Sequence, residues 1–371
     1  MNEAVTYRSP RPGELAECAL VWHAAVDDYM RRLARPLPPP YLDPLLALLA
    51  HLLTTDPERF VVAVRIAPRV APWESPSPRP LGSTPGPGGS SPPGNRLPAG
   101  LPPQFERIVG FGIAVQREHV WFLSQLYVLP EEQRRGIGRA LLTRVMPSMP
   151  SEGASQALDG GQGATPPTDV RPGVLATCTD SAQPVSNGLY GRFGIVARMP
   201  VFNLVGRPID PAALPALPEG IEAIPLEAAG GPATNTPNAS AIAEAIDAID
   251  RAVLGYAHPA DHAFLRTEGR TGFLYRTSGG DPIGYGYSSK AGRFGPVALL
   301  DETLTAPVVA HLLTAIEPRG ASSAWIPGAN DRAMVAMLRA GLRIEGFPGL
   351  MCWTRPFAAF ELYMPAGLSL L

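Results

Sequence analysis

The sequence has few cysteines, and their placement excludes several kinds of site. The three cysteines among the 371 residues, Cys18, Cys178 and Cys352, lie far apart and form no CxxC pair. They therefore suggest neither a disulfide framework nor a zinc site. We expect a reducing, cytoplasmic environment and no bound metal.

The sequence also lacks an excess of charge of either sign and a long hydrophobic run. The formal net charge is −2 at pH 7, so no overall charge attracts nucleic acid or a membrane surface. No run of about 18 apolar residues is present, and the first residues, MNEAVTYRSPRPGE, contain no apolar signal region. We expect no nucleic-acid or membrane partner. With 45% hydrophobic residues, a chain of this length can form about two domains with sizeable cores.

The most informative stretch is 123–146, LSQLYVLPEEQRRGIGRALLTRVM. Its first seven residues are apolar and β-prone, which predicts a strand. A polar, basic turn follows at 130–135. The residues after the turn carry apolar side chains at helical spacing until Pro147, which ends the helix.

The turn enters the helix through the sequence QRRGIG. Its two glycines, Gly136 and Gly138, place no Cβ between the main chain and a ligand. Free N–H groups at a helix N-terminus attract an anion, and nearby arginines suit phosphate. The combination predicts a pyrophosphate-binding loop. Because GKS, GKT and GxGxxG are all absent, neither a nucleotide-hydrolase loop nor a dinucleotide site is favoured.

Gln133, Gly136 and Gly138 fit the pattern Gln/Arg-x-x-Gly-x-Gly/Ala, and a V-x-P-E strand ending precedes them. The stretch thereby resembles motif A of the GCN5-related N-acetyltransferase (GNAT) family. The resemblance implies that the loop binds the pyrophosphate of acetyl-CoA, the co-substrate. It also implies that the preceding strand pairs with the pantetheine arm and donates to the thioester oxygen. The residues assigned to acetyl-CoA in this way are Leu126, Tyr127, Val128, Gln133, Arg134, Arg135, Gly136, Ile137, Gly138 and Arg139.

A second segment, 183–194, resembles motif B of the same family, Asn-x-x-Ala-x-x-x-Tyr-x-x-x-Gly. Tyr190 and Gly194 lie at the matching spacing, whereas Gln183 and Ser186 stand where Asn and Ala are usual. The resemblance implies that Tyr190 is the catalytic acid that protonates the leaving thiolate. The alternative interpretation of Tyr190 is a core aromatic residue with a hydrogen-bonded hydroxyl.

The sequence leaves the general base open. A lysine-like amine has a pKa of about 10.4 and is mostly protonated at neutral pH, so a base or a water chain is needed. Glu118 and His119 lie near a predicted hairpin tip, Asp180 ends a predicted strand, and His23 and Asp27 lie one turn apart on a predicted helix. Each of these residues also has a structural interpretation, as a solvated side chain or a loop cap.

Composition and element order predict the domain organisation. Two Gly-, Pro- and Ser-rich segments, 68–104 and 148–173, are interpreted as disordered insertions, and the proline-rich 206–219 as a linker. The predicted order of strands and helices after the linker repeats the order before it. We therefore predict an α/β (α+β) fold with GNAT-like domains at 1–205 and 220–371, each a mixed, mostly antiparallel sheet flanked by helices.

The second copy of the repeat lacks the chemistry of the first. Its equivalent loop, GPVALLDE, contains neither Gly-x-Gly nor arginine, and Met337 stands where the first copy has Tyr190. We interpret it as a degenerate domain that completes the acceptor pocket or packs against the first domain, so that a monomer acts as a pseudo-dimer.

The resemblance implies acetyl transfer to a primary amine of a small molecule or a peptide, with the acceptor unidentified. Two other classes stay open. One is a non-catalytic acyl-CoA-binding sensor, against which the presence of Tyr190 argues. The other is a scaffold protein whose proline-rich insertion recruits partners, against which the complete QRRGIG sequence argues.

Overall fold

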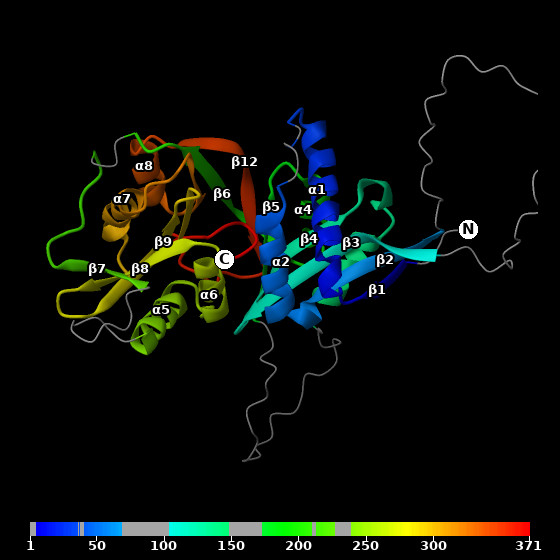
Figure 1. The fold of residues 1–371 in the computed structure, drawn as a ribbon, viewed down its shortest axis with the longest axis horizontal. Coiled ribbons are helices and arrows are strands. Elements are labelled where there is room, and N and C mark those ends of the chain that lie inside the picture. The colour runs from blue at the N-terminus through cyan, green and yellow to red at the C-terminus, as the bar shows by residue number, and fades with distance from the viewer. Residues whose placement is uncertain are drawn as a thin grey trace, which may run out of the picture.

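The computed structural model describes residues 5–35, 37, 41–68, 104–147, 173–209, 213–226 and 239–371. They form a large, mostly antiparallel sheet flanked by helices (Figure 1), which confirms the predicted fold class. Apart from their end residues, the two predicted insertions at 68–104 and 148–173 lie outside the described residues.

The same order of strands and helices occurs twice along the chain. The first half runs through β1 (Val5–Arg8), α1 (Leu15–Arg32), α2 (Asp43–Thr55), β2 (Phe60–Pro68), β3 (Gln104–Arg117), β4 (Val120–Val128), α3 (Ile137–Val145), β5 (Val174–Asp180), α4 (Pro184–Gly191) and β6 (Val196–Gly206). The second half runs through β7 (Ile221–Pro225), α5 (Ala239–Val253), α6 (Pro259–Thr267), β8 (Arg270–Thr277), β9 (Pro282–Ser289), β10 (Arg293–Leu299), α7 (Thr305–Ala315), β11 (Ser322–Pro327), α8 (Asp331–Arg339) and β12 (Arg343–Trp353). A short strand, β13 (Tyr363–Met364), follows. The repeat of element order expected from the sequence is thus present.

The two halves exchange their last long strands at the centre of the sheet. The strand order is β1-β2-β3-β4-β5-β12-β6-β11-β10-β9-β8-β7. Strand β12 of the second half pairs with β5 of the first, with Met351 opposite Cys178. Strand β6 of the first half pairs with β11 of the second, with Leu204 opposite Ala324. The division into domains at 206–219 stays a prediction, but each half completes its sheet with a strand from the other.

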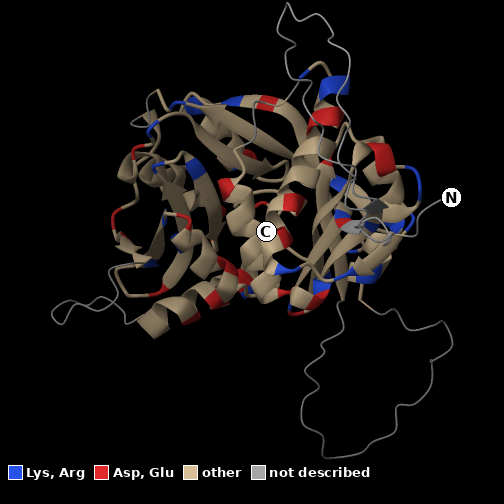
Figure 2. Ribbon diagram, turned by 45° about the vertical axis from the view of Figure 1, so that its right-hand side comes forward, with Lys and Arg blue, Asp and Glu red and all other residues tan. Residues whose placement is uncertain are grey.

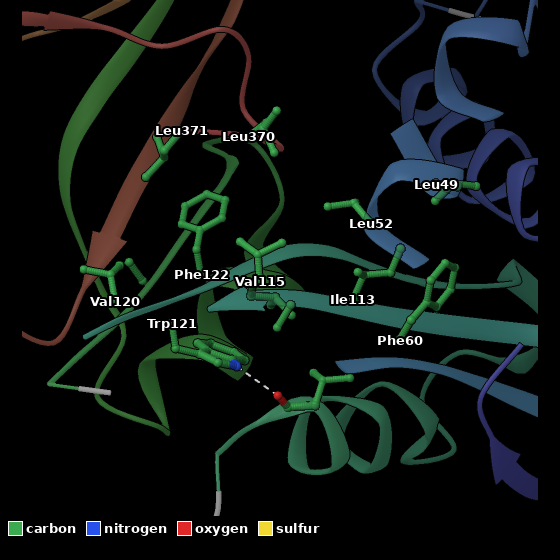
Figure 3. Packing of buried hydrophobic residues seen from close by; sticks show 14 of the residues in the cluster. Leu49, Leu52, Phe60, Ile113, Val115, Val120, Trp121, Phe122, Leu370 and Leu371 are labelled. Carbon is green, nitrogen blue, oxygen red and sulfur yellow. Dashed lines mark hydrogen bonds between the residues drawn. The ribbon is translucent and has the colours of Figure 1, made fainter. Parts of the chain in front are cut away.

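Side chains in the strands of the first half alternate between the two faces of the sheet, and different helices cover the two faces (Figure 3). Trp121 points toward α3, where its Nε1 donates to the backbone oxygen of Val145 at 2.9 Å. The neighbouring Phe122 points to the opposite face, toward Leu370 and Leu371. This alternation is the strand period of two, so the last residues of the chain contribute to the core of the first half.

Charged residues of both signs occur in both halves (Figure 2). One group of them is buried where the halves meet. Arg117, at the end of β3, lies 2.8 Å from a carboxylate oxygen of Asp56 and 2.9 Å from one of Asp261, on α6. His51, on α2, contacts the same Asp261 at 2.7 Å. This group joins the two halves through charges that are shielded from water. None of the described helices has the length and apolar character needed to cross a lipid bilayer.

We predict that Arg117→Met lowers the free energy of unfolding by about 3 kcal/mol, because it leaves two buried carboxylates without their cation. The matched control is Arg251→Met, which removes another ion pair between the halves. Arg251 contacts Glu118 at 2.9 Å, but its side chain is 55% exposed, so its loss should cost less than about 1 kcal/mol. Urea unfolding of both variants checks this, and similar losses would contradict the assignment of Arg117 as the buried junction.

Candidate functional site

The predicted anion-binding loop lies between β4 and α3 and has an unusual backbone. A short 3-10 turn, Pro130–Glu132, leads out of the strand. Gly136 then forms the N-cap of α3 with φ of +83°, and Arg134 also has a positive φ, +63°. Left-handed residues in a turn are typical of anion-binding nests, in which successive N–H groups face one ligand.

The N–H groups of this loop are free within the described residues. The first helical hydrogen bond runs from the N–H of Ala140 to the oxygen of Gly136 at 3.0 Å, and no described residue accepts from the N–H groups of 134–139. Gly136 is exposed. A Cβ at Gly138 would meet only Val128 Cγ2, at 3.8 Å. Unpaired, accessible donors at a helix N-terminus are a site for an anion.

The charged residues around the loop divide into free and engaged groups. Glu132 is only 7% exposed and contacts Arg65 at 2.8 Å and Arg135 at 3.2 Å. Arg135 is therefore partly neutralised. Arg134 and Arg139 are exposed and form no ion pair with any described residue, so these two remain available to a phosphate group.

The side chain of Gln133 stabilises the loop from within. Its Nε2 donates to the backbone oxygen of Val128 at 3.1 Å and joins the start of the loop to the end of β4. The backbone N–H of Gln133 donates to the oxygen of Pro130 at 3.3 Å, so the second N–H of Nε2 is the donor left for a ligand. The ligand-binding role of Gln133 stays a prediction.

Strands β4 and β5 separate beside this loop. They pair in parallel only from Val120 to Leu123, where Thr177 Oγ1 donates to the oxygen of Leu123 at 2.8 Å. Beyond this point, no described strand pairs with the β5-facing edge of β4. The edge that carries Leu126, Tyr127 and Val128 thus has no partner strand and could pair with an extended ligand, as the resemblance implies. The oxygen of Val128 is the exception, since it accepts from Gln133 Nε2.

Tyr190, on α4, lies in the core of the first half and is 5% exposed. Burial raises the pKa of its phenol above the ordinary value, and the nearby Tyr127 adds to the shift. The hydroxyl therefore stays protonated at neutral pH, as a proton donor must. Its burial is equally that of a core aromatic residue, so the catalytic role of Tyr190 stays a prediction.

Two of the candidate bases are engaged in other contacts. Glu118 contacts Arg251 at 2.9 Å and accepts from the N–H of Ala257 at 3.3 Å. Asp27 contacts Arg31 at 2.6 Å. These carboxylates hold neighbouring elements in place, which is their structural interpretation.

Three candidates for the base are less constrained. Asp180, where β5 ends, accepts from the N–H of Ala182 at 2.9 Å and so caps its loop. His119 is half-buried at the tip between β3 and β4. His23 has a buried Nε2 without a partner among the described residues. The base therefore stays open.

In the second half, the equivalent opening is filled by the chain itself. Strand β10 pairs with β11 at Arg293 and Phe294. It then pairs with β13, with Val297 opposite Met364. The C-terminal segment thus occupies the place where the first half leaves a strand edge free.

The loop after β10 is also closed to an anion. The carboxylate of Asp301 accepts from the N–H of Thr303 at 2.8 Å and from its hydroxyl at 2.7 Å. A negative charge therefore already caps the helical turn. Met337, at the position equivalent to Tyr190, is fully buried. These contacts agree with the predicted loss of acyl-CoA binding in the second copy, which itself stays a prediction.

The structure adds contacts that the sequence did not indicate. Ser369, near the end of the chain, meets β4 at the point where its pairing with β3 shifts register. Ser124 Oγ donates to the backbone oxygen of Ser369 at 2.6 Å, and Gln125 Nε2 donates to its hydroxyl at 2.7 Å. The second half thereby contacts the strand that borders the opening of the first half.

Residues 101–163 match the model of the acetyltransferase (GNAT) family. No curated protein matches the sequence. Among solved structures, a candidate acetyltransferase from Pyrococcus horikoshii has a TM-score of 0.60 at 14% identity, over 99% of this chain and 96% of the other. A GCN5-related N-acetyltransferase from Sphaerobacter thermophilus has a TM-score of 0.50 at 14% identity, over 95% of this chain and 96% of the other.

The match of residues 101–163 to the family model supports a protein of the acyltransferase class. The matched segment contains β4, the QRRGIG loop and α3. The resemblance to the GNAT family is therefore confirmed, and acyl transfer is the general reaction that the match supports.

We predict that Gly136→Ala destabilises the protein by about 1–2 kcal/mol, because Ala is strained at the left-handed φ of this N-cap. Gly138→Ala is the control, since its Cβ has room and Ala favours a helix. Thermal and urea unfolding should show a lower free energy of unfolding for Gly136→Ala and not for Gly138→Ala. Equal stability of the two variants would show that Gly136 is not held in this conformation.

Proposed function

We propose that the first half transfers an acetyl group from acetyl-CoA to a primary amine. The proposal depends chiefly on one observation. The exposed loop of 134–139 offers N–H groups that no described residue accepts from, and it directly follows a strand edge that is free beyond Leu123. A diphosphate next to an extended amide-containing arm is the chemical pattern that fits both features.

The reaction requires three tasks from this arrangement. The loop binds the pyrophosphate, with Arg134 and Arg139 adding positive charge. The free edge at Leu126–Val128 pairs with the pantetheine arm and donates to the thioester oxygen. The amine nitrogen then bonds to the acetyl carbon, the carbon–sulfur bond breaks, and the thiolate takes a proton from Tyr190. The proton lost by the amine passes to a base or a water chain.

The second half is proposed to support this site without catalysing a reaction. Strand β13 fills its own opening, and Asp301 occupies its loop. At the same time, Ser369 holds Ser124 and Gln125 of β4. We infer that this contact fixes the border of the acceptor pocket in the first half.

A non-catalytic acyl-CoA sensor is the second candidate. It is favoured by the engagement of Glu118 and Asp27 in ion pairs, which leaves Asp180, a loop cap, as the remaining carboxylate among the candidate bases. Release of free coenzyme A thiol from acetyl-CoA in the presence of a panel of primary amines distinguishes the two. Thiol release that depends on an amine supports the enzyme, whereas binding without amine-dependent release supports the sensor.

We predict that Gly138→Asp raises the dissociation constant for acetyl-CoA at least about tenfold, since its carboxylate would face the pyrophosphate and each 1.4 kcal/mol of repulsion is a factor of ten. Gly138→Asn is the matched control, with nearly the same shape and no charge, and should bind more tightly than Gly138→Asp. Isothermal titration calorimetry measures both. Unchanged affinity in the Asp variant would place the pyrophosphate elsewhere.

Tyr190→Phe is expected to lower kcat by about a hundredfold or more, the usual range for loss of an acid, and to leave acetyl-CoA affinity within about twofold. Tyr275→Phe is the control, because it removes another buried hydroxyl, one that contacts His311 at 2.9 Å in the second half. Steady-state rates and calorimetry separate turnover from binding. Full turnover by the Tyr190→Phe variant would leave Tyr190 as a core residue.

A further inference from the structure

The second half contains a buried group of two histidines and a carboxylate that the proposed reaction does not use. Asp250 lies on α5, His258 is the N-cap of α6, and His262 lies one turn further along α6. Their exposed fractions are 0%, 1% and 3%. One potential ligand atom from each lies within 4.8 Å of the others.

The distances within this group fit a tetrahedral metal site. Asp250 Oδ2 lies 3.3 Å from His258 Nε2 and 3.0 Å from His262 Nε2. When ligands surround zinc tetrahedrally at about 2.0–2.1 Å, neighbouring ligand atoms are about 3.3–3.4 Å apart. Two of the three separations are thus close to those around one ion. The rings of His258 and His262 stack with centroids 4.3 Å apart, so one ring must turn for both nitrogens to face the ion.

The hydrogen bonding of His258 also supports a metal site. Both of its ring nitrogens are buried and have no hydrogen-bond partner among the described residues. Nε2 lies close to Asp250 but is not directed at its oxygen. Buried polar atoms without a partner are costly and uncommon. An ion bound by Nε2 would satisfy one of them, and it would replace the hydrogen bond of 3.0 Å between His262 Nε2 and Asp250 Oδ2.

The surrounding residues could orient these ligands. His262 Nδ1 lies 3.0 Å from the hydroxyl of Tyr287. The Tyr285 hydroxyl donates to the other oxygen of Asp250 at 2.6 Å. His258 Nδ1 lies 3.8 Å from Asp261. Partners of this kind fix ring orientation and tautomer in metal sites.

The charges of the junction also favour a cation. Three carboxylates, Asp56, Asp250 and Asp261, are buried there, while Arg117 is the arginine that pairs with two of them. His51 also contacts Asp261, at 2.7 Å, so Asp250 is the carboxylate whose charge a divalent ion would balance if the histidines are neutral. Buried charge of one sign is costly when it is not compensated.

We propose that Asp250, His258 and His262 form a structural site for a divalent metal of the zinc type, which joins α5 to the start of α6. Neutral imidazole nitrogens and a carboxylate are ligands that zinc accepts. Three protein ligands leave the fourth position to water. The site is separate from the acyl-CoA loop and does not depend on the proposed function.

The test is metal uptake by the full chain. Because the ligands are buried, the protein is unfolded in chelator, refolded with and without zinc, and freed of loose metal by gel filtration. Elemental analysis should then find one zinc ion per chain, and the zinc form should melt at a higher temperature. Cobalt(II) in place of zinc should give the intense visible absorption of a tetrahedral ion.

Asp250→Asn and His258→Gln should abolish the retained zinc, whereas His311→Gln, which changes a histidine outside the group, should retain it. Cys178→Ser controls for binding by a thiol. If the variants do not refold, the cobalt spectrum of the unchanged chain tests the proposal, because its intensity reports directly whether the bound ion is tetrahedral. Refolded protein that retains no zinc, or an Asp250→Asn variant that retains as much as the unchanged chain, would overturn the proposal and leave a protonated His258 between two carboxylates.

Discussion

The arrangement of the whole chain depends on the pairing of β6 with β12 at the centre of the sheet. Each of these strands follows the last helix of its own half and enters the sheet of the other half. Backbone groups that are buried in a sheet need hydrogen-bond partners, and at the centre of this sheet each half supplies the partner strand for the other. Strand β12 ends beside the start of β5, where the N–H of Thr354 donates to the oxygen of Leu175 at 2.9 Å, so the residues after it begin where β4 and β5 are still paired. The two halves are consequently bound together by backbone hydrogen bonds rather than by surface contact alone.

The same topology has different consequences in the two halves because the backbone donors are satisfied differently. In the first half, the N–H groups of 134–139 have no described acceptor, and no described strand pairs with the β5-facing edge of β4 beyond Leu123. In the second half, Asp301 caps the loop and β13 pairs with the strand. A ligand can bind only where the protein has left donors open, so a repeated fold can carry a single site. The C-terminal segment acts on both halves. It fills the opening of the second half and then, through Ser369, contacts the strand that borders the opening of the first half.

The junction between the halves is polar as well as hydrophobic. Arg117 and His51 from the first half both reach Asp261 of α6, and Asp261 lies beside His258. Buried charges at this point fix how the halves meet, because a charge that is shielded from water is costly unless it contacts a partner of opposite charge. A metal held by the neighbouring Asp250, His258 and His262 would extend this junction into α5. Its role would be structural and would leave the acyl-CoA loop unaffected.

Local sequence determined the strands and helices around the loop. Helical spacing and Pro147 predicted a helix that the structure places at Ile137–Val145. The two glycines and their arginines indicated an anion site. Both predictions were possible because turn conformation and free N–H groups depend on residues that are neighbours in the sequence. The order of elements could also be predicted from the sequence, as could the absence of the Gly-x-Gly loop from the second copy, since both are patterns along the chain.

The exchange of β6 and β12, the filling of the second opening by Tyr363 and Met364, and the contact of Ser369 with β4 were decided only by the tertiary structure. So was the meeting of Asp250 with two histidines of another helix. These features depend on pairing and burial between residues far apart in sequence, and no local spacing specifies which strand edge or which buried charge will meet which partner.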